Sequence, residues 1–173
     1  MRVEVLERRH RTLLKEFRNQ HPPLVEYLRR YALRHAEKDQ LSRTYLALPP
    51  ENDRIAGYFS LAAASVERLA LGALETFEGL PRFPVPGVLL ARLAVDERAQ
   101  GQGVGRFMLE EALGISLHVA AKIAARLLVA DAIDNEAARF YERFGFARLS
   151  TAYPCRMVLD LKPLLEPASR QAR

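Results

Sequence analysis

Three glycines at alternate positions, Gly101, Gly103 and Gly105, stand between a strongly apolar segment and the longest helical pattern of the chain. Glycines leave backbone N–H groups uncovered, and the first turn of a helix points its free N–H groups and positive dipole end outward. This combination suits a pyrophosphate. The loop lacks the Lys-Ser/Thr pair of a nucleotide-hydrolysing loop, and its G-x-G-x-G spacing differs from the G-x-G-x-x-G of dinucleotide-binding proteins. The sequence therefore predicts a pyrophosphate site, with a merely tight turn as the alternative.

Acidic and imidazole side chains are the candidates for proton transfer. Asp96 and Glu97 directly follow the apolar segment before the loop, and Asp131 ends the next apolar segment. Such positions are typical of turn and cap residues, and we expect that role for all three. His35 and His118 fall on apolar helical faces and are expected in the core. The chain has a single cysteine and no metal-ligand spacing, so we expect no metal site and no disulfide within the chain.

Positive charge is concentrated in the first quarter of the chain. Residues 1–46 contain 11 Lys and Arg against 6 Asp and Glu, whereas residues 47–173 contain 15 of each. In the first long helical pattern, Arg30, Arg34 and Lys38 recur every four residues beside an apolar stripe. Such a face suits a polyanion such as nucleic acid, although a merely solvated charged face has the same pattern.

The elements that must position these residues alternate between strands and helices. Val88–Val95 and Arg126–Ala130 are almost wholly apolar, as expected of strands buried on both faces of a sheet. Between them, Gly103–Ile123 has the longest helical periodicity. The order predicts an α/β fold of mixed type in a single domain over residues 1–165, followed by a C-terminal tail over 166–173. The other expected elements are helices over Thr12–Asn19, Leu24–Lys38 and Asn135–Phe144, and strands over Met1–Leu6, Thr44–Leu48, Arg54–Leu61, Ser65–Leu71, Phe146–Ser150 and Cys155–Leu161.

Composition predicts a soluble cytoplasmic domain. With 173 residues, 49% of them hydrophobic and 27% charged, the chain can form a real core and is unlike disordered or collagen-like chains. The most apolar stretch, Ala112–Ala132, is interrupted by His118, Lys122 and Arg126, so we expect no membrane span. The N-terminus, MRVEVLERRHR, lacks the apolar centre of a secretory signal.

A second motif, DAIDNEAARFYERFGF at residues 131–146, favours a binding site over a merely tight turn at the glycine loop. Together the two stretches resemble the GCN5-related N-acetyltransferase (GNAT) superfamily. Its Q/R-x-x-G-x-G/A pattern matches Gln100, Gly103 and Gly105, and its later Asn-x-x-Ala…Tyr-x-x-x-Gly-Phe pattern matches Asn135, Ala138, Tyr141, Gly145 and Phe146. The resemblance implies a GNAT-like domain with a mixed, mostly antiparallel sheet flanked by helices, and acetyl-CoA as the cofactor.

The resemblance also implies roles for the matched residues. The pyrophosphate of acetyl-CoA would rest on the amides of the loop, and its pantetheine arm would pair with the preceding strand and face Asn135. Tyr141 would be the general acid that protonates the CoA thiolate as the tetrahedral intermediate collapses. The alternatives are a helix cap for Asn135 and a packed core tyrosine for Tyr141. The implied cofactor-binding set is Leu93, Ala94, Val95, Gln100, Gly101, Gln102, Gly103, Val104, Gly105 and Asn135.

Four further stretches resemble one subgroup, the acetyltransferase toxins of bacterial toxin–antitoxin pairs: residues 24–32, 42–48, 54–66 and 83–96. Asn19-Gln20-His21 stands where this subgroup usually has a Cys-Gly-like element. The resemblance implies acetylation of the aminoacyl group of charged tRNA, which blocks translation, with a ribbon–helix–helix antitoxin as partner and a homodimer as the assembly. The residues expected to contact the tRNA are Arg30, Arg34, Lys38, Arg43 and Arg92.

Two other functions stay open at this point. The same fold and cofactor could serve a small-molecule amine or a protein N-terminus as acceptor, and substrate binding would then depend little on salt. The chain could instead be a non-catalytic regulator that contacts operator DNA together with an antitoxin. The intact glycine loop and Tyr141 favour catalysis.

Overall fold

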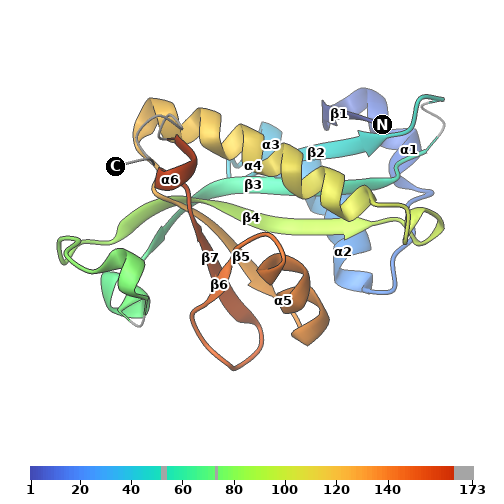
Figure 1. The fold of residues 1–173 in the computed structure, drawn as a ribbon. Coiled ribbons are helices and arrows are strands. Elements are labelled where there is room, and N and C mark those ends of the chain that lie inside the picture. The colour runs from blue at the N-terminus through green and yellow to red at the C-terminus, as the bar shows by residue number, and fades with distance from the viewer. Residues whose placement is uncertain (52–53, 73, 166–173) are drawn as a thin grey trace. The chain divides into compact units, whose positions relative to one another are not determined.

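The computed structural model describes residues 1–51, 54–72 and 74–165. Its strands form a seven-stranded mixed sheet in the order β1-β2-β3-β4-β5-β7-β6, with helices flanking it (Figure 1). This confirms the predicted α/β fold class. Within the described ranges, no helix is both long and apolar enough to cross a membrane. The tail predicted over 166–173 lies outside the described residues, and the single domain over 1–165 stays a prediction.

The first of two compact units contains Met1–Ala62 and Leu90–Leu113. Its first three strands pair antiparallel, and Tyr45 and Phe59 face each other across two of them with ring centroids 4.9 Å apart. Cross-strand aromatic pairs of this kind stabilise a register. The strands of this unit are β1 (Arg2–Val5), β2 (Arg43–Leu48), the first part of β3 (Gly57–Val66) and the second half of β4 (Val85–Val95).

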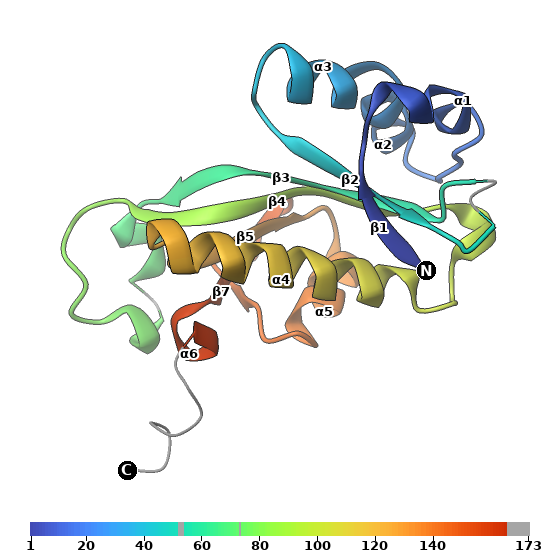
Figure 2. The same cartoon turned by 90° about the horizontal axis from the view of Figure 1, so that it is seen from above.

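Helices cover both faces of this unit. Figure 2 shows α1 (Arg11–Leu14), α2 (Pro22–Glu26) and α3 (Ala32–Glu37) on one side of β2 and β3, and the first half of α4 (Val104–Ile123) on the other side. The apolar sides of α1 to α3 pack on the strands, because burial of apolar surface is the main favourable term in folding. The core of the unit includes Leu14, Phe17, Leu28, Leu46, Ile55 and Tyr58.

The helix predicted over Leu24–Lys38 is present as an unbroken helical run over residues 22–37, with Lys38 as its C-terminal cap. We call residues 22–38 the basic run. It begins at Pro22, whose restricted φ suits the first position of a helix. A π-helical turn over Tyr27–Tyr31 connects α2 to α3. Turns of this type are frequent at functional sites.

The prediction of a helix over Thr12–Asn19 is wrong in its second half, because α1 ends at Leu14. The backbone N–H of Arg18 donates to the Asp96 carboxylate at 2.9 Å, and the carbonyl of Arg18 accepts from the amide of Glu97 at 3.0 Å. Both groups are therefore satisfied at the end of β4, and a longer helix would have had to break these bonds.

The second compact unit contains Ala63–Leu89 and the chain from Gly114 onward. β5 and β7 pair antiparallel along their whole length, and α5 packs against both strands. Gly145, with φ +85°, ends the turn after α5, as its position in the sequence suggests. The elements are β5 (Leu127–Ala132), α5 (Asn135–Glu142), β6 (Ala147–Arg148), β7 (Cys155–Asp160) and α6 (Lys162–Leu165), of which α6 is not apparent in the sequence pattern.

The strand predicted over Ser65–Leu71 is wrong. β3 begins later than predicted and continues to Val66, and a 3-10 turn over Arg68–Leu71 follows it. This turn buries Leu71 in the core of the unit and leaves Leu69 94% exposed. The apolar residues of this segment therefore have the spacing of a 3-10 turn, and they do not alternate between the two faces of a strand.

Candidate active site

The glycine loop lies between β4, which ends at Val95, and α4, which begins at Val104. Gly101 and Gly103 have φ angles of +73° and +79°, in the left-handed region that other residues rarely adopt. A Cβ atom at either position would meet nothing within 4 Å. The backbone conformation therefore requires glycine here, and the space beside both residues is open to a ligand.

The start of α4 has the features of an anion site. The helix is 20 residues long, and the amide of Phe107 donates to the carbonyl of Gly103 at 3.0 Å. The amides before Phe107 have no partner within the helix. Val104 is buried and anchors the first turn, whereas Gln100 and Gln102 are exposed. Free amides at the positive end of a long helix can hold a pyrophosphate.

A segment that sequence reasoning missed is fastened to the end of β4. We call it the strap (residues 16–21). The side-chain amide of Asn19 donates to the carbonyl of Val95 at 2.9 Å, and its oxygen accepts from the amide of His21 at 2.9 Å. Arg98 also donates to the carbonyl of Glu16 at 3.0 Å. The only sequence signal for the strap is that Asn19-Gln20-His21 departs from the toxin subgroup.

The acidic residues that follow β4 have the cap and turn roles predicted for them, since Asp96 caps the 3-10 turn over Glu97–Ala99. Asp96 is buried, and its carboxylate accepts from the amides of Arg18 and Arg98 and from the Arg98 guanidinium at 2.8 Å. Burial alone would raise the pKa of Asp96, but these hydrogen bonds hold it below its ordinary value. The same expectation is wrong for Asp131, which lies within β5 and accepts two hydrogen bonds from Arg156 of the paired strand β7, at 2.9 and 3.0 Å. Neither carboxylate is arranged as a general base.

Tyr141 lies on α5 with 7% of its surface exposed. Its ring contacts those of Phe140 and Phe146, each with centroids 5.3 Å away. Burial raises the pKa of the Tyr141 phenol above its ordinary value, and the negative charge of Asp131 raises it further. The phenol is therefore neutral and retains its proton at physiological pH, which is what a general acid requires.

Asn135 begins α5 but does not cap it. The carboxylate of Asp134 accepts from the amide of Ala137 at 2.8 Å and is the cap, which leaves the Asn135 side chain free of that role. The Asn135 oxygen accepts instead from Arg148 and from the Tyr153 hydroxyl, both at 3.2 Å.

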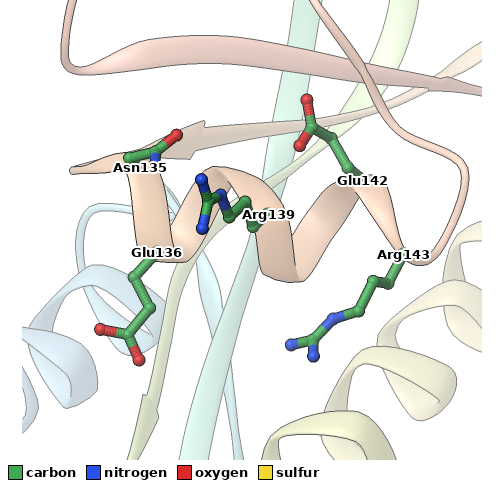
Figure 3. A pocket seen from close by; sticks show the side chains of 5 residues that line it. All are labelled: Asn135, Glu136, Arg139, Glu142 and Arg143. Carbon is green, nitrogen blue, oxygen red and sulfur yellow. The ribbon is translucent and has the colours of Figure 1, made fainter.

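A pocket of about 820 Å³ opens on the outer face of α5. Figure 3 shows Asn135 and Glu142 extending to one side of the helix and Glu136 and Arg143 to the other, with Arg139 between them. The lining is polar and mixed in charge, so it suits a hydrated polar ligand better than an apolar one.

Comparison with known proteins identifies the family. Residues 50–148 match the family model described as an acetyltransferase (GNAT) domain. A tRNA-acetylating toxin of Mycobacterium tuberculosis (strain ATCC 25618 / H37Rv) is 34% identical over 147 residues, which is 84% of each chain. The chain belongs to the GNAT acetyltransferases. The resemblance inferred from the two sequence motifs is confirmed, and this GNAT acetyltransferase uses acetyl-CoA.

Solved structures of the toxin AtaT have the same fold. AtaT complexed with acetyl-methionyl-tRNAfMet has a TM-score of 0.84 and 23% identity, covering 94% of this chain and 96% of that chain. A tyrosine-to-phenylalanine mutant of AtaT, bound to the C-terminus of the antitoxin AtaR and to acetyl-CoA, has a TM-score of 0.75 and 22% identity, covering 94% of each chain. At this identity the likeness establishes the fold alone.

The GNAT acetyltransferase presents the predicted cations of the basic run on its surface, since Arg30, Arg34 and Lys38 are all exposed. Arg30 pairs with Glu26 at 3.2 Å and Arg34 with Asp39 at 3.0 Å. Exposed ion pairs contribute little, typically ~1 kcal/mol or less, so they leave both guanidinium groups available.

Four other cationic or imidazole side chains that the sequence singles out differ in their surroundings. Arg43 is exposed at the first position of β2, and Arg92 of β4 stacks over the Tyr27 ring at 5.1 Å. His35 is half-buried beside the rings of Tyr27 and Tyr31, so it lies at the edge of the core in which it was expected. The expectation that His118 is in the core is wrong, because its position on α4 faces solvent.

Proposed function

We propose that this GNAT acetyltransferase transfers the acetyl group of acetyl-CoA to the α-amine of the aminoacyl group on charged tRNA, and thereby blocks translation. The observation that carries the proposal is its relationship to the Mycobacterium tuberculosis tRNA-acetylating toxin, at 34% identity over 84% of both chains. The complex of AtaT with acetyl-methionyl-tRNAfMet supports the same acceptor. The exposed cations of the basic run supply the charge that an RNA backbone requires.

The residues present fit acetyl-CoA, which supplies an activated acetyl thioester. A pyrophosphate needs amide donors that no side chain covers, and the loop with Gly101 and Gly103 at positive φ provides them at the start of α4. In this proposal the pyrophosphate binds the amides of the loop, and the pantetheine arm pairs with the end of β4 and faces Asn135. The residues assigned to the loop and the strand end are Leu93, Ala94, Val95, Gln100, Gly101, Gln102, Gly103, Val104 and Gly105.

The chemistry needs one proton donor. The amine nitrogen attacks the thioester carbon, the C–N bond forms and the C–S bond breaks, and the departing sulfur takes a proton from the Tyr141 hydroxyl. Water then restores the proton of the phenol. A free α-amine titrates near ~8 and an esterified one lower, so much of the amine is already neutral before it attacks. The nitrogen becomes cationic when the C–N bond forms, and it then releases one proton to solvent. A dedicated general base is therefore unnecessary.

The proposal also includes the cellular location, the protein partner and the assembly of the enzyme. Charged tRNA is a cytoplasmic substrate, so we place the reaction in the cytoplasm. The complex of AtaT with the C-terminus of AtaR supports an antitoxin partner for this chain, of the ribbon–helix–helix class that the sequence resemblance implies. A homodimer is part of the same proposal.

Salt dependence separates this function from acetylation of a small amine or a protein N-terminus. If three cations of the basic run bind phosphates, binding of charged tRNA should weaken roughly 20- to 40-fold between 50 and 200 mM salt. Changing Arg30, Arg34 and Lys38 together to Glu should weaken acetylation of charged tRNA by orders of magnitude and leave acetyl-CoA affinity unchanged.

The matched control changes three other exposed cations, Arg11, Lys15 and Lys122, to Glu and should retain most of the tRNA activity. Acetylation of charged tRNA that is insensitive to salt and to the triple change, beside efficient acetylation of a small amine, would contradict the proposal.

A further inference from the structure

Tyr31 is an exposed aromatic residue on the basic run. It ends the π-helical turn, with 42% of its surface exposed. Its ring lies 6.1 Å from the ring of His35, which meets Tyr27 edge-on at 5.6 Å. The guanidinium of Arg92, on β4, covers the Tyr27 ring at 5.1 Å. A continuous row of contacts, which we call the ring row (Tyr31, His35, Tyr27 and Arg92), therefore connects an exposed aromatic surface to strand β4.

Cations border the ring row. Arg30 directly precedes Tyr31, and Arg34 follows it by three residues. The ion pairs of these arginines with Glu26 and Asp39 are at the surface, where the two arginine side chains are 72% and 65% exposed. Surface pairs of this kind are weak, so each guanidinium can turn to a phosphate, which it binds in a bidentate manner.

An aromatic ring between cations fits a single-stranded nucleic acid in particular. Bases stack on Tyr and His rings with little regard to sequence, while arginines bind the neighbouring phosphates. A double helix offers phosphates but no free base face, and an acidic peptide would engage the cations and leave Tyr31 unused. The 3′ end of charged tRNA is single-stranded and bears the aminoacyl ester, so this segment has the matching chemistry.

We propose that Tyr31, supported by His35, is a stacking platform for a base of the single-stranded 3′ end of charged tRNA, with Arg30, Arg34 and Arg92 binding the adjoining phosphates. This inference rests on the proposed function and adds a base contact to it. The contact is independent of which amino acid the tRNA carries. It determines affinity for the RNA and leaves the chemistry at the amine unchanged.

The test compares Tyr31→Ala with Tyr31→Phe, which keeps the ring, and with Phe83→Ala, which removes a 75% exposed aromatic elsewhere on the surface. The KM for one charged tRNA is measured at saturating acetyl-CoA, together with acetylation of the methyl ester of the same amino acid. The ester has the amine but no base. Thermal melts of each variant monitor folding.

Tyr31→Ala should raise the KM for charged tRNA roughly tenfold or more, whereas Tyr31→Phe and Phe83→Ala should stay within about threefold of the parent. Acetylation of the ester should be the same for all four proteins. An unchanged KM in folded Tyr31→Ala, or an equal loss with the ester, would overturn the stacking platform. If the parent acetylates the ester but no charged tRNA, the proposed function itself fails, and the platform fails with it.

Discussion

The side-chain amide of Asn19 donates a 2.9 Å hydrogen bond to the backbone carbonyl of Val95, 76 residues further along the chain. Val95 is the last residue of β4, directly before the turn that leads into the glycine loop. A carbonyl oxygen has two lone pairs, and Asn19 occupies one of those of Val95. The strap therefore orients the strand end on which the pantetheine arm is proposed to pair.

Asn19→Asp should weaken acetyl-CoA binding by roughly five- to tenfold, because a carboxylate cannot donate to the Val95 carbonyl and repels it instead. The substitution keeps the shape of the side chain and its acceptor for the His21 amide. Calorimetry with acetyl-CoA measures the change.

Gln20→Glu is the matched control, since it makes the same amide-to-carboxylate change at the neighbouring exposed position. It should bind acetyl-CoA as the parent does. Equal affinities of Asn19→Asp and Gln20→Glu would show that the strap has no influence on the cofactor.

Gly103→Glu should abolish measurable acetyl-CoA binding. A non-glycine residue at φ +79° costs roughly 1–2 kcal/mol in the backbone, and the added carboxylate repels the pyrophosphate. Gly114→Glu adds the same charge inside α4, where a Cβ atom meets nothing within 4 Å, and should bind acetyl-CoA normally. Binding by folded Gly103→Glu within a few-fold of the parent would rule out the loop as the pyrophosphate site.

Asp96 should link the stability of the fold to pH. Its folded-state pKa is depressed, so the stabilisation is present above the unfolded value near ~3.9 and is lost as the pH falls through the lower folded value. Asp96→Asn removes this titration. The free energy of unfolding of the parent should therefore fall more steeply below about pH 4 than that of Asp96→Asn. Parallel pH profiles from urea melts of the two proteins would contradict this role.

Local sequence signals were sufficient to predict the strand and the helix on either side of the glycine loop. The apolar run before the loop, the glycines and the long helical period are all visible in one continuous stretch, and the structure has β4, the positive φ angles and α4 there. Asp134 likewise precedes α5 in the usual position of a cap. Signals confined to neighbouring residues predict such features well.

Features that depend on distant partners could not be predicted in this way. The helix over Thr12–Asn19 ends early because Arg18 and Asn19 find hydrogen-bond partners in β4 and the turn after it. No local pattern marks those partners. Arg29 looks like another cation of the basic run, yet it donates to the carbonyls of Leu14, Lys15 and Phe17 and holds the end of α1.

Single-turnover transfer of labelled acetyl from acetyl-CoA to charged tRNA, by the parent and by Tyr141→Phe, tests the central claim most directly. The parent should label charged tRNA but not the same tRNA stripped of its amino acid, because the acceptor is the aminoacyl amine. Tyr141→Phe keeps the ring among Phe140 and Phe146, so its melting temperature and acetyl-CoA affinity should be close to those of the parent. Its transfer rate should fall by roughly 10²–10⁴-fold, because the general acid is lost. No label on charged tRNA from the folded parent, or an unchanged rate in folded Tyr141→Phe, would contradict the account.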